Sequence, residues 1–271
     1  MRPAAWVFVD DLDGLGLRPA DAHHLGRVLR LRPGEAVGAS DGAGRWRPCV
    51  VVATGDIRLE GTGAVVVEPL QKPAVTIGFS LVKGDRPELV VQKLTELGVD
   101  RIVPLAAARS VVRWDEERAR RGVTRLRQVA REAAMQARRA RLPEVAMLTT
   151  VAAAARAVGD SGALCDQGGT APLGLARPTL LVGPEGGWDP AELRCGLPTV
   201  DLGPTTLRAE TAAIAAAVLL CGLRSATVGQ GPADITPLEQ LEPSRLSRAE
   251  DGNCLRSSDR GDEWPSKPRS S

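Results

Sequence analysis

The first 70 residues alternate short apolar runs with turn signals, a pattern typical of small β structures. Turn-forming residues such as Arg32-Pro33-Gly34 separate these runs. A short helix is expected to begin near residue 18 and to continue to about residue 29. Residues 1–70 are therefore predicted to form a small β-barrel with one helix. Its strands are expected at residues 6–9, 36–39, 47–52 and 63–67.

From residue 74 the pattern changes to apolar runs that alternate with amphipathic segments. Helices are expected at residues 87–97, 118–139 and 209–223. The last of these segments is apolar all round and is therefore expected to be buried. Such alternation predicts an α/β fold for residues 74–225, an open, mainly parallel sheet covered by helices. Its strands are expected at residues 75–79, 100–105, 163–165, 179–182 and 199–202.

Residues 226–271 are rich in Pro, Ser and charged side chains and show no sustained apolar period. We expect a disordered tail there, because such a segment cannot bury enough apolar surface to become ordered. The whole chain of 271 residues is 43% hydrophobic and 25% charged, which is ordinary for a globular protein. It has no apolar run of about 18 residues and no signal-peptide core, so we expect a cytoplasmic protein without membrane association.

Cysteine and histidine usage argues against a metal centre. The five cysteines form no CxxC pair, which disfavours a disulfide framework or a zinc site and fits a reducing compartment. The two histidines, His23 and His24, are adjacent, and no second histidine region exists to complete a catalytic triad. We therefore expect a metal-free protein.

Positive charge is concentrated in the middle of a nearly neutral chain. The formal net charge is +2, yet residues 71–150 hold 16 Lys and Arg against 9 Asp and Glu, an excess of +7. Between residues 118 and 141 the only acid is Glu132. Such a patch favours a polyanion such as RNA, although a solvated helix face is the alternative. Its nine arginines are Arg118, Arg120, Arg121, Arg125, Arg127, Arg131, Arg138, Arg139 and Arg141.

Two glycine-containing loops follow predicted strands and lack the usual phosphate-binding motifs. Residues 181–188 read Leu-Val-Gly-Pro-Glu-Gly-Gly-Trp, a loop with accessible backbone amides, or alternatively a structural tight turn. In residues 202–212, Arg208 and Glu210 open an otherwise apolar helix. Charged residues at the start of an apolar helix indicate that they line a cleft or have a charged partner. The alternative is an ordinary helix start, where the helix dipole favours Glu210. Ligands of open α/β sheets bind at such strand ends.

Polar residues at 83–98 and at 132–139 complete a set of motifs that resembles one known family. The chain resembles the bacterial 16S ribosomal RNA (uracil-1498-N3)-methyltransferases, the RsmE family, over residues 2–224. The most specific matches are Gly183-Pro184-Glu185-Gly186-Gly187 with Glu192, and the 202–212 segment. Arg138 stands where the family usually has a small residue. Further matches are His24, Val28-Leu29-Arg30, Gly34, Lys83, Asp85-Arg86, Gln92-Lys93, Glu96-Leu97-Gly98, Arg109, Glu132-Ala133, Gln136, Arg139 and Pro143.

The resemblance implies a SPOUT-type domain with a trefoil knot, an N-terminal PUA-like barrel and a homodimer. It also implies S-adenosylmethionine as the cofactor, bound by loops at residues 164–166, 183–187 and 202–212, and 16S rRNA of the small ribosomal subunit as the partner. The implied cofactor-binding residues are Leu164, Gly183, Pro184, Glu185, Gly186, Gly187, Leu202, Gly203, Leu207, Thr211 and Ala212. The implied RNA-binding residues are Arg2, Arg27, Arg30, Lys83, Arg86, Lys93, Arg109, Gln136 and Arg139.

Methylation at uracil N3 requires that the N3 proton be removed or that the anion be stabilised. We expect Arg208 to stabilise charge on the uracil oxygens and Glu210 to be the nearest candidate base. Two alternatives remain open at this point. One is an RNA-binding protein without catalysis, and the other is a knotted enzyme that methylates a ribose 2′-hydroxyl.

Overall fold

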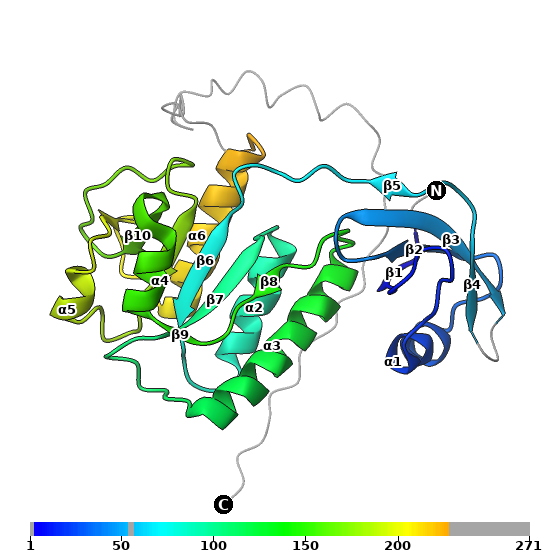
Figure 1. The fold of residues 1–271 in the computed structure, drawn as a ribbon, viewed down its shortest axis with the longest axis horizontal. Coiled ribbons are helices and arrows are strands. Elements are labelled where there is room, and N and C mark those ends of the chain that lie inside the picture. The colour runs from blue at the N-terminus through cyan, green and yellow to red at the C-terminus, as the bar shows by residue number, and fades with distance from the viewer. Residues whose placement is uncertain (1–2, 54–56, 228–271) are drawn as a thin grey trace, which may run out of the picture. The chain divides into compact units, whose positions relative to one another are not determined.

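The computed structural model describes residues 3–53 and 57–227, and all of them belong to one compact unit of the chain. The N-terminal sheet has the strand order β1-β2-β3-β4, with β5 paired to β3 (Figure 1). The pair β1–β2 is parallel, whereas β2–β3 and β3–β4 are antiparallel. The strands are β1 (Ala5–Phe8), β2 (Ala36–Ser40), β3 (Arg45–Ala53), β4 (Arg58–Gly61) and β5 (Val66–Val67).

The helical part of this N-terminal region is shorter and less regular than expected. Helix α1 (Pro19–His23) runs directly into a π-helical turn, η1 (His24–Val28). Pro19 suits the first turn, because a proline there loses no backbone hydrogen bond. Leu25 of η1 is fully buried against Val7, Val37 and Val51 of the sheet. The expected β-rich region with one short helix is therefore present, with β4 as the strand that the apolar pattern did not indicate, whereas closure of its five-stranded sheet into a barrel stays a prediction.

A second sheet carries the rest of the described chain, and all its strand pairs are parallel. The order is β12-β10-β11-β6-β7-β8, with β9 paired to β7. The α/β class with a mainly parallel sheet is confirmed. The strands are β6 (Thr76–Ser80), β7 (Arg101–Ala106), β8 (Glu144–Val145), β9 (Thr149–Thr150), β10 (Gly162–Cys165), β11 (Thr179–Val182) and β12 (Thr199–Val200).

Helices cover both faces of this sheet, because alternate residues of each buried strand point to opposite sides. Leu180 and Val182 of β11 join the core beneath α2, α3 and α6, whereas Leu181 joins the core beneath α4. The helices are α2 (Arg86–Glu96), α3 (Glu116–Gln136), α4 (Val151–Val158), α5 (Pro190–Leu193) and α6 (Ala209–Arg224), with a 3-10 turn, η2 (Gly159–Ser161) (Figure 1).

Two expectations about helices need correction. Helix α3 begins at Glu116, after the Asp115 cap, and ends at Gln136, so its first turn adds two acids to the arginine-rich segment. Helix α6 is not buried all round: Ala213, Ala216 and Leu220 are fully buried, but Val218 is 44% exposed. A uniformly apolar helix gives no signal of which face meets the sheet, and here only one face does.

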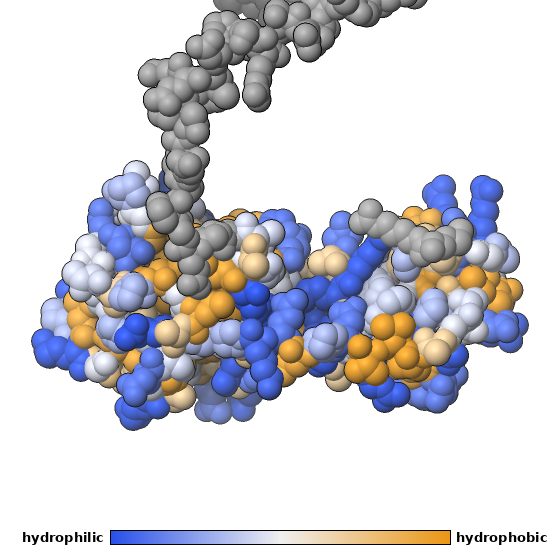
Figure 2. All heavy atoms as spheres, turned by 90° about the horizontal axis from the view of Figure 1, so that it is seen from above, coloured by the Kyte–Doolittle hydropathy of each residue, from blue (hydrophilic) through white to orange (hydrophobic). Residues whose placement is uncertain are grey.

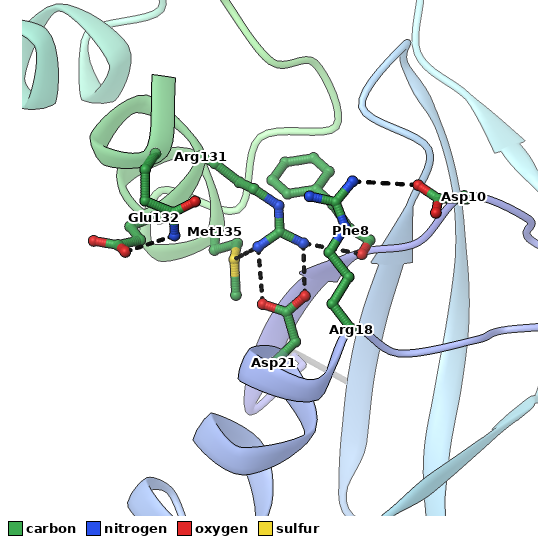
Figure 3. Close-up of polar contacts among 8 residues, drawn as sticks. Phe8, Asp10, Arg18, Asp21, Arg131, Glu132 and Met135 are labelled. Atoms are coloured by element: carbon green, nitrogen blue, oxygen red, sulfur yellow. Dashed lines mark hydrogen bonds and ion pairs between the residues drawn. The ribbon is translucent and has the colours of Figure 1, made fainter. Parts of the chain in front are cut away.

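Helix α3 also joins the second sheet to the N-terminal region through buried contacts (Figure 3). The Arg131 guanidinium donates two hydrogen bonds to the Asp21 carboxylate, at 2.8 and 2.7 Å, and a third to the Phe8 carbonyl at 3.2 Å. Phe8 packs with Trp6, Ala134 and Ala140 in a small core of its own. Arg131 thus stabilises the junction and is only 8% exposed.

Hydrophilic residues surround smaller groups of hydrophobic ones on the face seen in Figure 2. None of the helices described here is both long and apolar enough to cross a membrane. The expected tail, residues 226–271, lies almost entirely outside the described residues, as does Arg2.

Candidate active site

Three loops meet at the carboxyl edge of the parallel sheet and enclose a cavity of about 350 Å³. They follow β10, β11 and β12, and the first turn of α6 closes the cavity. Parallel strands end at the same edge of a sheet, which is why loops distant in sequence converge there. The lining residues are Cys165, Asp166, Gln167, Val182, Gly183, Pro184, Glu185, Gly186, Gly187, Trp188, Asp201, Leu202, Gly203, Thr205, Thr206, Leu207, Ala209 and Ala212.

Trp188 fastens the loop after β11 to the loop after β10. Its indole Nε1 donates to the Cys165 carbonyl at 2.9 Å, and the side chain is only 4% exposed. A Cβ atom at Gly183 would lie 3.0 Å from the Trp188 ring, so a glycine at 183 allows this close packing. Gly187 has φ +70°, a conformation that favours glycine. Burial raises the pKa of the Cys165 thiol to about 12, so the thiol stays neutral.

Glu192 anchors the same loop to the segment that follows β7. Its Oε2 accepts from the Asp189 amide at 2.9 Å in a capping box, and its Oε1 accepts from the Ala108 amide at 2.8 Å. Arg109 adds a hydrogen bond from Nη1 to the Gly186 carbonyl at 3.3 Å. The glycine loop is thereby held at both its centre and its end.

Asp201 organises the third loop. Its two carboxylate oxygens accept from the amides of Gly203 and Gly168, each at 2.9 Å. These backbone hydrogen bonds hold the pKa of Asp201 below its usual value of 3.8. Thr206 Oγ1 donates to Gln167 Oε1 at 3.0 Å, which links this loop to the loop after β10. All three loops are therefore connected by hydrogen bonds.

An ion-pair cluster lies beside the cavity. The Arg86 Nη1 atom, at the start of α2, lies 3.5 Å from Glu210 Oε1 and 3.8 Å from Glu185 Oε1. The Glu210 side chain is 13% exposed, and its Oε2 is buried without a hydrogen-bond partner in the described part of the chain. Arg208 is exposed, and its side chain does not cap α6. Glu210 thus has one oxygen held by a cation and one buried oxygen without a partner among the described residues.

Most of the expected cofactor residues line the cavity, but two do not. Leu164 is fully buried with the α4 face of the sheet, because strand alternation turns it away from the edge that Cys165 reaches. Thr211 is exposed on α6 outside the lining, whereas Ala212 is part of it. Sequence reasoning missed Gln167, Trp188 and Asp201, although Trp188 directly follows the glycine pair and could have been included.

The expected RNA-binding residues differ in their surroundings. Arg27, Arg30, Lys83, Arg109 and Gln136 are exposed. Lys93 instead pairs with Glu96 at 2.8 Å. The Arg139 Nη1 atom donates to the carbonyls of Thr95 and Val99, at 2.7 and 3.0 Å.

Several arginines of the segment 118–141 are less available for RNA contacts than its composition indicates. Arg131 is buried, and Arg127 donates from Nε to the Val145 carbonyl at 3.0 Å. Arg120 and Arg121 pair with Glu116 and Glu117, the acids of the first turn. Part of the positive charge of this segment therefore lies on an exposed face of α3, in ion pairs with acids of the same helix.

Comparison with known proteins places the chain in a family. Residues 69–221 match the model of an RNA methyltransferase domain, and residues 17–62 match that of an RNA methyltransferase PUA domain. A ribosomal RNA small subunit methyltransferase E from Mycobacterium bovis is 37% identical over 214 residues, which are 72% of this chain and 81% of the relative. The chain belongs to the ribosomal RNA small subunit methyltransferase E family. Its enzyme class is therefore RNA methyltransferase, and the family resemblance is confirmed.

Solved structures of two methyltransferases agree with this assignment to the methyltransferase E family. A methyltransferase from Legionella pneumophila with bound S-adenosylmethionine is 26% identical, with a TM-score of 0.70 over 83% of this chain and 98% of that one. The methyltransferase E from Neisseria gonorrhoeae, also bound to S-adenosylmethionine, is 27% identical, with a TM-score of 0.68 over 79% and 95% of the two chains. The fold with its PUA domain is thus confirmed, whereas the knot stays a prediction.

The cavity of this methyltransferase E family member fits a cofactor without phosphate groups. Its volume lies within the roughly 300–1,000 Å³ typical of small-molecule sites. Side chains added at Gly187 or Gly203 would project into open space, so backbone is accessible there. Leu202, Leu207 and Ala212 offer apolar contact for an adenine, and the carboxylates of Asp166 and Glu185 offer negative charge for a cationic ligand.

Proposed function

We propose that the protein methylates N3 of a 1498-type uridine in the 16S rRNA of the small ribosomal subunit, with S-adenosylmethionine as its cofactor. The observation that carries this proposal is the placement of Glu210 and Arg86 beside the cavity formed by the three loops. The relatives are ribosomal RNA small subunit methyltransferases by name, which supports the substrate class, and two structural neighbours contain the cofactor. Small-subunit rRNA is a cytoplasmic substrate, so the same location is proposed for the enzyme.

The cavity residues hold the cofactor, which supplies a methyl group on a positively charged sulfur. Glu210 acts at the uracil: its carboxylate, paired with Arg86 at 3.5 Å, takes the proton from N3 and so leaves an electron pair on that nitrogen. The cofactor would supply the methyl group to this pair, its bond from the methyl carbon to sulfur breaking as the bond to N3 forms and a neutral thioether leaving. Arg86 stabilises the Glu210 carboxylate before the reaction, and the exposed Arg208 stabilises negative charge on the uracil oxygens. Because N3 lies on the Watson–Crick edge, the target uridine reacts unpaired.

The remaining assignments belong to the same proposal. Residues 1–70 form the RNA-binding region and residues 74–225 the catalytic one. Two copies associate through the exposed side of α6 around Val218, a homodimer that sedimentation or light scattering tests directly. Phosphate contacts are assigned to Arg27, Arg30 and Lys83, which are exposed. Arg109 is exposed too, but its side chain bonds the Gly186 carbonyl and lies 3.9 Å from Asp189, so its RNA contact stays a prediction. RNA contacts by Lys93 and Arg139, which have partners within the chain, stay predictions.

Mass spectrometry of nucleosides from small-subunit RNA treated with enzyme and S-adenosylmethionine tests the proposal. We expect 3-methyluridine, and a loss of activity of roughly 10²–10⁴-fold in Glu210→Gln, since this variant lacks the proton acceptor. Glu117→Gln, at an exposed position on α3, is the matched control and should retain full activity. A 2′-O-methylated product would favour the ribose-methylating alternative, and RNA binding without any methylated product would favour the non-catalytic one.

A further inference from the structure

A second cavity, of about 630 Å³, lies outside the site described above. Three segments form it: the end of β6 with the start of α2, the segment before α3, and the first turns of α3. It shares no lining residue with the cofactor cavity. Its lining residues are Val82, Lys83, Gly84, Pro87, Glu88, Val112, Trp114, Arg118, Arg121 and Gly122.

An aromatic ring forms part of this cavity, and helix α3 is adapted to it. A Cβ atom at Gly122 would lie 2.4 Å from Cζ3 of Trp114, so the ring packs directly on the helix backbone. Glycine in the interior of a helix weakens it relative to alanine, and close contact with Trp114 explains its presence here. Trp114 is half-buried and also packs against the core of the parallel sheet, and within the described residues its indole nitrogen has no hydrogen-bond partner.

Cations outnumber acids around the ring. Lys83, Arg118 and Arg121 line the cavity against the single acid Glu88, an excess of +2. Arg121 is paired with Glu117 on the helix surface, whereas no ion pair or side-chain hydrogen bond joins Arg118 to any described residue. A partly buried indole that lines the cavity beside cations without ion-pair partners suits an unpaired nucleotide, whose base stacks on the cavity side of the ring and whose phosphate meets the cations.

The position of the cavity connects it with the target nucleotide. Lys83 precedes Arg86 by three residues, a span of at most about 10 Å, and Arg86 contacts both Glu185 and Glu210. Ser110 links the segment after β6 to the segment before α3, because its single hydroxyl proton is shared between the carbonyls of Leu81, at 2.7 Å, and Val112, at 3.1 Å. The Lys83 side of the cavity is therefore the side nearest along the chain to the Arg86–Glu210 pair, where the target nucleotide is proposed to react.

We infer that this cavity is a subsite for a flanking nucleotide of the RNA. An unpaired base adjacent to the target uridine stacks on Trp114, and its phosphate is bound by Lys83 and Arg118. The inference rests on the proposed function, since the flanking position is defined relative to the methylated uridine. It adds a determinant of substrate choice that is separate from the cofactor loops.

Paired substitutions at Trp114 separate stacking from packing. In Trp114→Leu the apolar contact with Gly122 remains but the aromatic face is lost, whereas Trp114→Phe retains a ring. We expect KM for an RNA fragment containing the target to rise by roughly 5- to 150-fold in Trp114→Leu, the range for loss of one stacked base, with kcat little changed. Trp114→Phe should recover most of this loss.

The cationic part of the site is tested in parallel. Arg118→Gln should weaken RNA binding and reduce the slope of log K against log salt by about 0.7–0.9 for one phosphate on a single strand or duplex. Arg120→Gln is the control, because Arg120 lies on the same helix, is paired with Glu116 and does not line the cavity.

A fluorescent base locates the nucleotide. When 2-aminopurine replaces the base immediately on either side of the target, we expect quenching by the wild type and by Trp114→Phe at one of these positions, and none by Trp114→Leu. Equal KM and equal fluorescence in Trp114→Leu and the wild type would refute the subsite. Failure of the proposed function is distinguishable, because the wild type would then form no 3-methyluridine at all.

Discussion

Removal of Asp21 should destabilise the protein far more than removal of any exposed ion-pair partner. In Asp21→Ala the Arg131 guanidinium stays buried and loses both hydrogen bonds to the carboxylate. Its remaining contacts are the Phe8 carbonyl at 3.2 Å, the Met135 sulfur at 3.3 Å and the Phe8 ring, whose centroid lies 5.6 Å from Cζ (Figure 3). One neutral carbonyl and one ring do not replace a bidentate carboxylate.

The magnitude follows from the burial of the pair. The Arg131 and Asp21 side chains are 10% and 6% exposed, so water gives little compensation. Breaking such a pair costs about 3–5 kcal/mol, and the residual exposure places the expected loss near the lower end, about 3 kcal/mol. For a domain of this size the melting temperature should fall by about 6–12 °C. Arg120→Ala breaks a pair that is 63% and 86% exposed and should cost less than about 0.5 kcal/mol.

Urea unfolding of a double-mutant cycle provides the measurement. Arg131→Met retains an unbranched side chain next to Met135, so the double variant Asp21→Ala/Arg131→Met leaves no unpaired charge. Its loss of unfolding free energy should be at least about 2 kcal/mol smaller than the sum of the two single losses. If Asp21→Ala costs less than about 1 kcal/mol, or if the two losses simply add, the buried pair does not stabilise the junction as described.

Three further outcomes are expected. Gly186→Val should abolish cofactor binding in calorimetry. The protein should stay folded, since the nearest atom to the new Cβ would be a carbon of Arg109 at 3.4 Å, an ordinary contact. Gly174→Val, outside the cavity, is the control, and unchanged affinity in Gly186→Val would contradict the site. Because the pKa of Asp201 is lowered in the folded protein, the contribution of this carboxylate to folding stability is complete above about pH 4 and is lost at lower pH. Asp201→Asn should therefore lose less stability than the wild type between about pH 5 and pH 3. Equal losses would count against the role of Asp201 in holding the third loop. Cys165 should resist iodoacetamide at about pH 8 until urea is added, because its pKa is about 12; labelling of the native protein, mapped by peptide mass spectrometry, would disprove this.

The fold was largely predictable because its strands are buried on both faces. Strands β6, β7, β10 and β11 appear in the sequence as nearly continuous apolar runs, which is typical of parallel sheets. Strand β4 and helix α4 were not predictable in this way, nor were the short elements β8, β9 and α5. Strand β4 contains alternating polar residues and lies half exposed, and α4 is an alanine-rich segment whose short apolar pattern did not distinguish a helix from a loop.

The glycine-rich parts of the site were predictable, whereas the side chains that join them were not. Gly183 and Gly203 are recognisable because their backbone conformation and close packing restrict residue type. Trp188 and Asp201 act through partners on other loops, and a single sequence contains no record of such pairing. The same reason explains Arg131, whose partner Asp21 lies 110 residues earlier in the chain.

The anchoring of the glycine loop to the segment after β7 has a thermodynamic consequence. Glu192 and Arg109 join the loop that faces the cofactor to the segment that leads to Trp114. A ligand that orders one side lowers the entropy still to be lost when the other side is ordered. If each ligand orders its own side, occupancy of the two cavities is cooperative, and reciprocity then requires the cofactor to tighten RNA binding by the same factor by which RNA tightens cofactor binding. The enzyme would accordingly bind its RNA most tightly when it already holds the methyl donor.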